Sequence, residues 1–187
     1  SVIPASVGSS MVLVKSSQGF SVTNSDTLAS AYIENCFNST YRDYVIYITG
    51  TIGTTKGDLR FRFGNSSGRI SDAHYLYVNN GRDSGGTTRN LEAQNVTHAV
   101  ILNGADGTTV SNLFYDRVVL TMKIHNPQPS GGIIWTGTSS IPRYETAFIN
   151  SNFGGTYRKD YSATNMQLYL SAGSGTFNFQ SYGIKTS

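Results

Sequence analysis

A short alternation of apolar and charged residues, from Leu59 to Phe63, constrains the fold of this chain more than any other feature. Successive side chains of a β-strand point to opposite faces, so the leucine and both phenylalanines share one face while Arg60 and Arg62 share the other. Residues 117–124 repeat the same period of two. Both segments predict half-buried strands, and we expect the two arginines to lie in water.

The rest of the chain also favours strands. Ser, Thr, Asn and Gly together make up over two fifths of it, and 12% is aromatic. Helical bundles and coiled coils instead need Ala, Glu, Lys, Leu and Arg. Residues 26–37 are the one helical rival, but their Ser, Thr and Asn make them poor helix formers, so we expect one short turn there at most. The pattern predicts about ten short strands separated by Gly- and Asn-rich breaks.

Strands with one apolar face need a second layer to bury that face. We therefore expect an all-β fold, a jelly-roll-like antiparallel β-sandwich, formed by residues 11–187 as a single domain. Residues 1–10 lack periodicity and contain Pro, Gly and Ser, which predicts an N-terminal arm or linker. The lone cysteine, Cys36, has no disulfide partner and apolar neighbours, so we expect a buried thiol.

The charge of the chain indicates neither nucleic-acid nor membrane binding. Its net charge of +3 comes from 14 Lys and Arg against 11 Asp and Glu. No basic run forms a nucleic-acid patch. No apolar stretch reaches the roughly 20 residues of a membrane helix, and the chain opens on no signal-peptide pattern. We expect a protein made in a cytoplasm and used without membrane insertion.

No pattern of catalytic residues stands out. His74, His98 and His125 are far apart in the sequence, and Asp72 near His74 lacks a third metal ligand. The Gly-rich residues 85–88 lack the lysine and helix of a phosphate loop. We therefore expect no enzyme, no cofactor and no metal. A pair of carboxylates brought together in space would leave a small glycan-active enzyme as a remote alternative.

Five segments occur in the order found in one class of viral proteins. They read Met11-Val12-Leu13-Val14-Lys15-Ser16, Cys36-Phe37-Asn38-Ser39-Thr40-Tyr41-Arg42-Asp43-Tyr44, Leu59-Arg60-Phe61-Arg62, Met122-Lys123-Ile124-His125-Asn126-Pro127 and Ser174-Gly175-Thr176-Phe177-Asn178-Phe179-Gln180-Ser181-Tyr182-Gly183-Ile184-Lys185. Together they resemble the β-sandwich modules at the ends of tailed-phage tail fibres and of other virion surface proteins. Arg42 departs from that pattern, which usually has Asp there, so an acidic role at this position lacks support.

The resemblance implies a non-enzymatic bacteriophage protein located in the virion. It also implies partners, namely other copies of the chain in a trimer and other virion proteins. Two functions remain open. One is a receptor-binding module that attaches to a glycan or protein of the host surface, and the other is a capsid decoration protein that docks on the particle.

Candidate contact residues follow from loops and aromatic side chains. Residues 79–86 and 127–132 are predicted to be exposed loops, whose Tyr, Ser, Gly and Asn content resembles that of antibody loops. The single tryptophan is predicted either to fill the core or to stack on a sugar or an interface, and the sequence leaves both open. The candidate ligand- or interface-contact residues are Tyr47, Tyr75, Tyr77, Arg82, Asp83, Trp135 and Tyr169.

Overall fold

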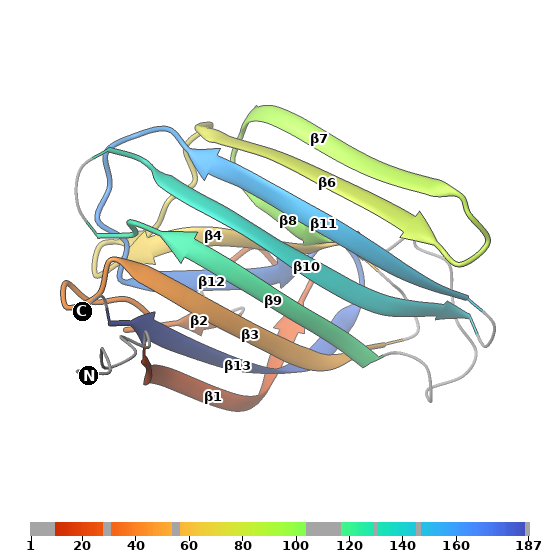
Figure 1. The fold of residues 1–187 in the computed structure, drawn as a ribbon, viewed down its shortest axis with the longest axis horizontal. Helices are drawn as coiled ribbons and strands as arrows, with labels where there is room; N and C mark the ends of the chain where they lie inside the picture. The colour runs from red at the N-terminus through yellow and green to blue at the C-terminus, as the bar shows by residue number, and fades with distance from the viewer. Residues whose placement is uncertain are drawn as a thin grey trace, which may run out of the picture.

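The structure, a computed structural model, describes residues 10–27, 31–53, 57–103, 117–128, 131–144 and 147–185. Two antiparallel sheets pack face to face (Figure 1), and about 68% of the described residues lie in strands. The described ranges contain no helix. The predicted all-β sandwich is confirmed.

The larger sheet has eight strands. In spatial order they are β1 (Met11–Thr23), β13 (Ser174–Ile184), β3 (Asp43–Ile52), β9 (Arg117–His125), β10 (Ile133–Tyr144), β11 (Ala147–Tyr157), β6 (Tyr75–Asp83) and β7 (Thr88–Val96). The N-terminal and C-terminal strands β1 and β13 are therefore neighbours, and β1 and β7 form the two edges.

The smaller sheet has five strands, counting β8, which pairs only with β4. They are β2 (Tyr32–Ile33), β12 (Asn165–Leu170), β4 (Leu59–Asn65), β5 (Gly68–Arg69) and β8 (Ala99–Leu102). The chain crosses between the sheets on either side of β2, of β8 and of β12, and also between β3 and β4 and between β5 and β6. This repeated crossing is the jelly-roll-like feature of a sandwich that has more strands than the usual eight.

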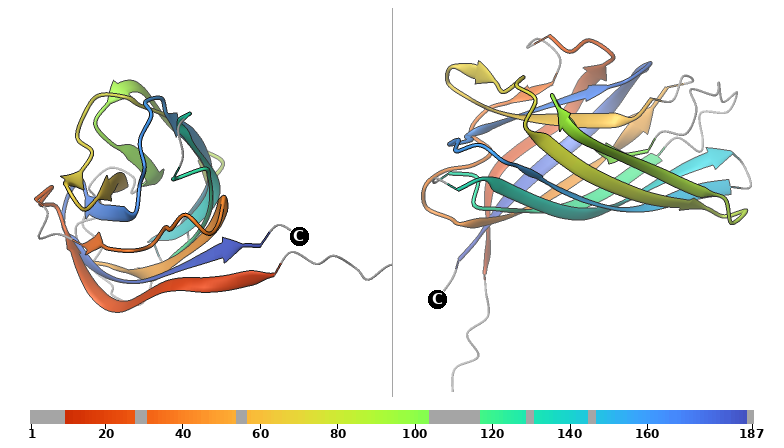
Figure 2. Two further views of the ribbon diagram at one scale, coloured as in Figure 1. Left: turned by 90° about the vertical axis from the view of Figure 1, so that its left-hand side faces the viewer. Right: turned by 90° about the horizontal axis from the view of Figure 1, so that it is seen from above.

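The larger sheet curls around the smaller one, which lies inside its curve (Figure 2). The space between the sheets is filled by aromatic rings. Trp135 meets the rings of Phe61 and Phe63 at centroid distances of 5.1 and 5.9 Å, and Tyr75 meets Tyr157 at 4.9 Å. These edge-on and tilted contacts are the arrangements that aromatic quadrupoles favour. The core therefore uses the apolar face that the alternation in β4 predicts.

The prediction that Arg62 lies in water is wrong. Only 5% of Arg62 is exposed. Its Nε donates to the backbone oxygen of Thr97 at 2.7 Å, and its guanidinium lies 4.8 Å above the ring of Tyr169. Asp26 Oδ2 lies 3.4 Å from Nη1. The outer side of the smaller sheet is covered by segments of the chain itself, and the alternation in β4 cannot reveal that cover. Arg60 is also only part-exposed, with 29% of its side chain accessible beside Asp58.

Other predictions differ from the structure in their boundaries. Residues 79–83 belong to strand β6, so the predicted loop 79–86 is only a tight turn after Asp83. In the helical rival 26–37, residues 28–30 lie outside the described residues, and the described part contains the short strand β2 with bends and one turn beside it. Residues 11–23 form the single strand β1, which contains register shifts between Leu13 and Lys15 and between Ser17 and Phe20. The proposed arm lies outside the described residues up to residue 9, as do residues 129 and 130 of the second predicted loop.

The prediction of a buried thiol is confirmed. Cys36 has no exposed surface and no disulfide partner. Its Sγ lies 3.2 Å from the backbone oxygen of Ile33. Burial raises the pKa of this thiol, so it is not a reactive thiolate at neutral pH.

Candidate binding face

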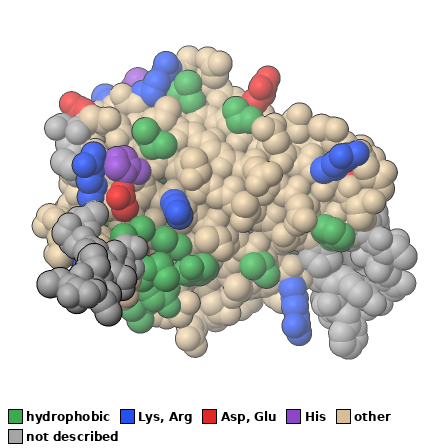
Figure 3. Space-filling model, in the orientation of Figure 1, with side chains coloured by type: hydrophobic (Ala, Val, Ile, Leu, Met, Phe, Trp, Pro, Cys, Tyr) green, Lys and Arg blue, Asp and Glu red, His purple; other side chains and the backbone are tan. Residues whose placement is uncertain are grey.

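The two sheets differ in what covers their outer sides. All six residues of β12 in the smaller sheet are buried. Gln167 points away from the core but has no exposed surface, because its Nε2 donates to the backbone oxygens of Asp26 and Thr27. In the larger sheet, the outward side chains of β9 and β10 are mostly exposed. The outer face of the larger sheet is therefore the broad open surface of the described protein (Figure 3).

One row of side chains crosses this outer face from edge to edge. The strand register aligns one outward residue from each of the eight strands, and every one of them is polar and uncharged. We call this set the polar row; it consists of Ser16, Gln180, Tyr47, Thr121, Thr138, Asn152, Asn80 and Asn90. Eight aligned hydroxyl and amide groups offer both donors and acceptors and carry no net charge.

The rows beside it carry only scattered charges. Lys123 and Glu92 lie in the row on one side, and Arg82 lies in the row on the other side. Farther along, His125 and Asp43 bond to each other through Nδ1 and Oδ1. Figure 3 shows the same pattern, with isolated blue and red side chains on a largely uncharged surface. The face has no concentrated field that would select a charged ligand.

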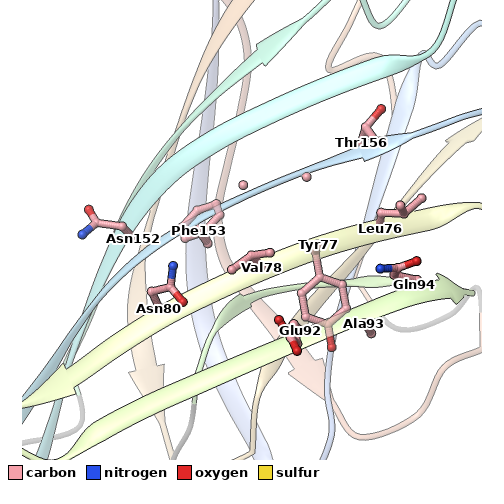
Figure 4. Close-up of a pocket in the computed structure, with 12 residues that line it drawn as sticks. Leu76, Tyr77, Val78, Asn80, Glu92, Ala93, Gln94, Asn152, Phe153 and Thr156 are labelled. Carbon is pink, nitrogen blue, oxygen red and sulfur yellow. The ribbon is translucent and has the colours of Figure 1, made fainter.

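The first hollow on this face lies over β11, β6 and β7 and has a volume of about 720 Å³ (Figure 4). Gly154 forms its floor, because this position points outward without a side chain and pairs with Val78 on β6. Amide groups of Asn152, Asn80 and Gln94 surround it, together with apolar atoms and the carboxylate of Glu92. The hollow combines a glycine floor and apolar side-chain atoms with several amide donors and acceptors, and the polar row supplies two of those amides.

The second hollow lies over β1, β13 and β3 and has a volume of about 290 Å³. Its lining consists of Gln18, Tyr47, Thr49, Asn178 and Gln180. Gln18 reaches it because a register shift lies between Ser17 and Phe20, where Gly19 adopts φ +63°. The Gly19 amide then donates to Asn178 Oδ1 at 2.9 Å. This bulge turns three amides and a tyrosine ring toward one shallow site.

An apolar cluster marks the β1 edge of the same face. Met11 and Leu13 are 51% and 52% exposed, and their strand partners are Ile184 and Tyr182. Figure 3 shows hydrophobic side chains gathered at this end of the sheet. We call Met11, Leu13, Tyr182 and Ile184 the edge patch. Exposed apolar groups on an edge strand are typical of a surface that contacts another protein.

Two of the seven predicted contact residues, Tyr47 and Arg82, lie at the open face. Tyr47 belongs to the polar row and lines the second hollow. Arg82 is exposed on the outer side of β6. A third, Tyr77, belongs to the lining of the first hollow, although its ring packs toward the core and His98. Burial raises the pKa of Tyr77, so its hydroxyl stays protonated.

The other four predicted contact residues do not lie there, and their assignment to a binding surface is wrong. Tyr75 and Trp135 are core residues with 0% and 1% exposure, so the core alternative for the tryptophan is correct. Tyr169 is 4% exposed beneath Arg62. Asp83 is 8% exposed, and its Oδ1 accepts from the backbone amide of Thr87 at 2.8 Å, which closes the turn after β6.

The sequence prediction missed most of the polar row. Thr121, Thr138, Asn152 and Asn80 alternate with buried residues on their strands, so each could be assigned to an outer face. Their alignment depends on the register between strands that are distant in the sequence. The adjacent glycines Gly154 and Gly155 were the one local signal of the first hollow, since glycine inside a strand marks a site of close approach.

A charged cluster at one end of the sandwich is already internally paired. Partial burial would raise the pKa of Asp72, but hydrogen bonds from Lys159 and Tyr157, at 3.0 and 2.9 Å, outweigh it and lower the pKa. In the described ranges, no three His, Cys, Asp or Glu residues could hold a metal ion. Within the same ranges, no helix has the length and apolar character to cross a membrane.

Neither a protein family model nor a curated protein sequence matches this chain. The candidate site therefore rests on the geometry of the outer face.

Proposed function

We propose that this chain is a non-enzymatic surface module of a bacteriophage virion, which attaches the particle to its host through the outer face of the larger sheet. The resemblance of five segments to virion surface modules supports the viral setting. The observation that carries the binding role is the polar row, an unbroken line of uncharged polar side chains across all eight strands.

The chemistry of this face suits a glycan without charge. Sugar hydroxyls both donate and accept, as do the amides and hydroxyls of the row. Tyrosine adds a rigid surface that is apolar on its ring and polar at its hydroxyl. Each hydrogen bond contributes only about 0.5–1.5 kcal/mol net, so single contacts give weak binding. Several modules on one particle would convert weak contacts into stable attachment.

A panel of purified bacterial envelope polysaccharides, neutral and anionic, tests this proposal. We expect the immobilised chain to retain one or more neutral polymers and to lose them after periodate, which cleaves vicinal diols of sugars. Protease treatment of whole host cells should leave binding intact. Retention of anionic polymers only, or loss of cell binding after protease, would overturn the glycan assignment. Release of new reducing ends from the polymer would show an enzyme instead.

The edge patch supports a second candidate function, that of a structural part of the particle. Strand β1 ends the sheet order, so its outer backbone groups have no strand partner among the described residues. Its exposed Met11 and Leu13 stand beside that open edge. A second copy of the chain fits this surface, because it has the same apolar edge. The edge patches of two copies could then pack against each other. The two functions use different parts of the face and are compatible.

A further inference from the structure

We infer that one linear, uncharged polysaccharide chain lies along the polar row, across the strands, and places sugars in both hollows at once. This inference rests on the proposed function and specifies its ligand as a polymer rather than a single sugar.

The two hollows are connected by the row itself. Gln180 and Tyr47 belong to the row and line the second hollow, while Asn152 and Asn80 belong to it and line the first. Thr121 and Thr138 lie between the two hollows. Thr121 pairs with Tyr47 and with Thr138, and Thr138 pairs in turn with Asn152. From β3 to β11 there are three strand steps, which is about 14 Å at the usual strand spacing. A ligand that fills both hollows must therefore span several sugar rings.

The side chains also set the direction of the ligand. Along strand β9, the outward residues pass from Arg117 through Val119 and Thr121 to Lys123, so charge and apolar groups interrupt the hydroxyls. Along β3, the outward line passes from Asp43 through Val45 to Tyr47. Along β13 the outward residues from Ser174 to Tyr182 are also uncharged and polar, but that line stays on one strand and reaches only the second hollow. The line across the strands joins both hollows. A polymer of repeated hydroxyl groups matches that line at every strand.

Neither hollow alone is a deep pocket for a small sugar. The second has a volume of about 290 Å³ and is lined by the amides of Gln18, Asn178 and Gln180, with Tyr47 and Thr49. The first is larger but broad, with Gly154 at its floor. Two weak sites on one ligand reinforce each other, because the second contact becomes intramolecular once the first has formed. Affinity should therefore rise steeply with the length of the chain.

The test uses the neutral polysaccharide that the native chain retains best from the panel, cut to fragments of two, four and eight sugars. Calorimetric titration of the full chain should show that the octasaccharide binds at least about tenfold more tightly than the disaccharide. Tyr47→Ala and Asn152→Ala, one in each hollow, should each reduce this length dependence.

Thr138→Arg distinguishes a ligand that spans both hollows from one that fills a single hollow. Thr138 is exposed between the two hollows and lines neither. We expect this substitution to weaken octasaccharide binding about tenfold and disaccharide binding less than about twofold. Phe148→Arg is the matched control. It adds the same charge to the same face at a position that is 49% exposed and about 13 Å along β11 from the row. It should change neither affinity, and circular dichroism and thermal melts should show that both variants fold.

Equal affinity for short and long fragments, or an octasaccharide affinity unaffected by Thr138→Arg, would overturn this inference and leave the proposed glycan attachment standing. Failure of every neutral polymer in the panel to bind would overturn both. If the outer face bound a peptide or protein of the host and no polysaccharide, that result would also overturn both proposals.

Discussion

Arg62 carries its charge inside the protein, where Thr97, Asp26 and the ring of Tyr169 replace water. Truncation would remove the donor to the part-buried backbone oxygen of Thr97 and would open a cavity beside the ring of Tyr169. We therefore expect Arg62→Ala to lower the free energy of unfolding by about 3 kcal/mol. Arg60→Ala is the matched control on the same face of β4, and 29% of its side chain is exposed. It should cost much less. Urea denaturation measures both, and equal costs would contradict the assigned burial of Arg62.

His98 makes the free energy of unfolding depend on pH in the acidic range. Burial, and then the charges of Arg60 and Arg62, lower the pKa of its imidazole to about 4. Its ring also contacts those of Tyr77 and Tyr169. The unfolded chain takes up a proton near pH 6.5 and the folded chain does not, so acid favours unfolding. The contribution of His98 to stability is complete above pH 6.5 and is lost as the pH falls toward 4.

We expect the urea midpoint of the native chain to fall more between pH 7 and pH 4.5 than that of His98→Gln, because the glutamine side chain does not titrate. Carboxylates titrate in both proteins and cancel in the comparison. The same fall in both would show that His98 is protonated in the folded state.

At the residue scale, burial was predictable where a side chain is apolar. The face that holds Phe61 and Phe63 follows from their alternation, and Cys36 follows from its neighbours. The environment of Arg62 was not predictable, because its cover consists of the segments around Asp26 and Thr97, which are far from it in the sequence. The polar residues of a predicted outer face do not reveal whether other segments of the chain cover that face.

Strand β11 shows how two adjacent glycines serve opposite faces of one element. Gly155 pairs with Trp135, and a Cβ there would lie 2.4 Å from the indole and 2.2 Å from the backbone oxygen of Leu76. Gly154 points outward, where the nearest atom to a Cβ would be the backbone oxygen of Trp135 at 3.2 Å. The first glycine makes room for the core tryptophan, and the second opens the floor of the first hollow.

We expect Gly155→Ala to lower the free energy of unfolding by about 1–3 kcal/mol, because the added methyl group overpacks the core and displaces a neighbouring strand. Gly154→Ala should cost clearly less and should instead weaken glycan binding by reducing the hollow. Thermal melts of the two variants provide the comparison. If the two substitutions had the same effect on stability, the assignment of the two faces of β11 would be wrong.

At the element scale, the sequence predicted strands better than their pairing. The period of two in residues 117–124 corresponds to β9, and its inward residues are all buried. β11 contains Asn150 and two adjacent glycines, which have low β-propensity. The neighbouring strands β10 and β6 hold them in the strand from either side. The polar row depends on these pairings, so it could not be predicted from any single strand.

At the scale of the whole molecule, the edge patch is expected to hold copies of the chain together. We expect light scattering after size exclusion to show a homo-oligomer, with the trimer suggested by the resemblance to virion modules. Leu13→Lys should shift it to the monomer, because a charge at the centre of an apolar interface is costly to bury. Phe148→Lys, which adds the same charge at a similarly exposed site outside the patch, should not.

A native chain that remains monomeric at all concentrations from micromolar upward would contradict self-association through the edge patch. An oligomer that Leu13→Lys leaves intact would place the interface elsewhere.

The two-sheet architecture was predictable because strands with one apolar face have few ways to bury it. The location of the binding surface was not. The sequence directed attention to loops such as residues 79–86, but most of that segment is strand, and the open surface is the face of the larger sheet. The difference arises because, within the described residues, segments of the chain cover the smaller sheet and leave the outer face of the larger one exposed.

A nuclear magnetic resonance titration would show whether ligand binds on the outer face of the larger sheet. Backbone amide shifts of the isotope-labelled chain would be followed while the best-retained neutral octasaccharide is added. We expect the largest changes at Tyr47, Thr121, Thr138 and Asn152, with little change at Gln167 or Arg62 on the covered sheet. Changes confined to the ends of the sandwich, around Ser67 or Gly131, with the polar row unaffected, would contradict binding on this face.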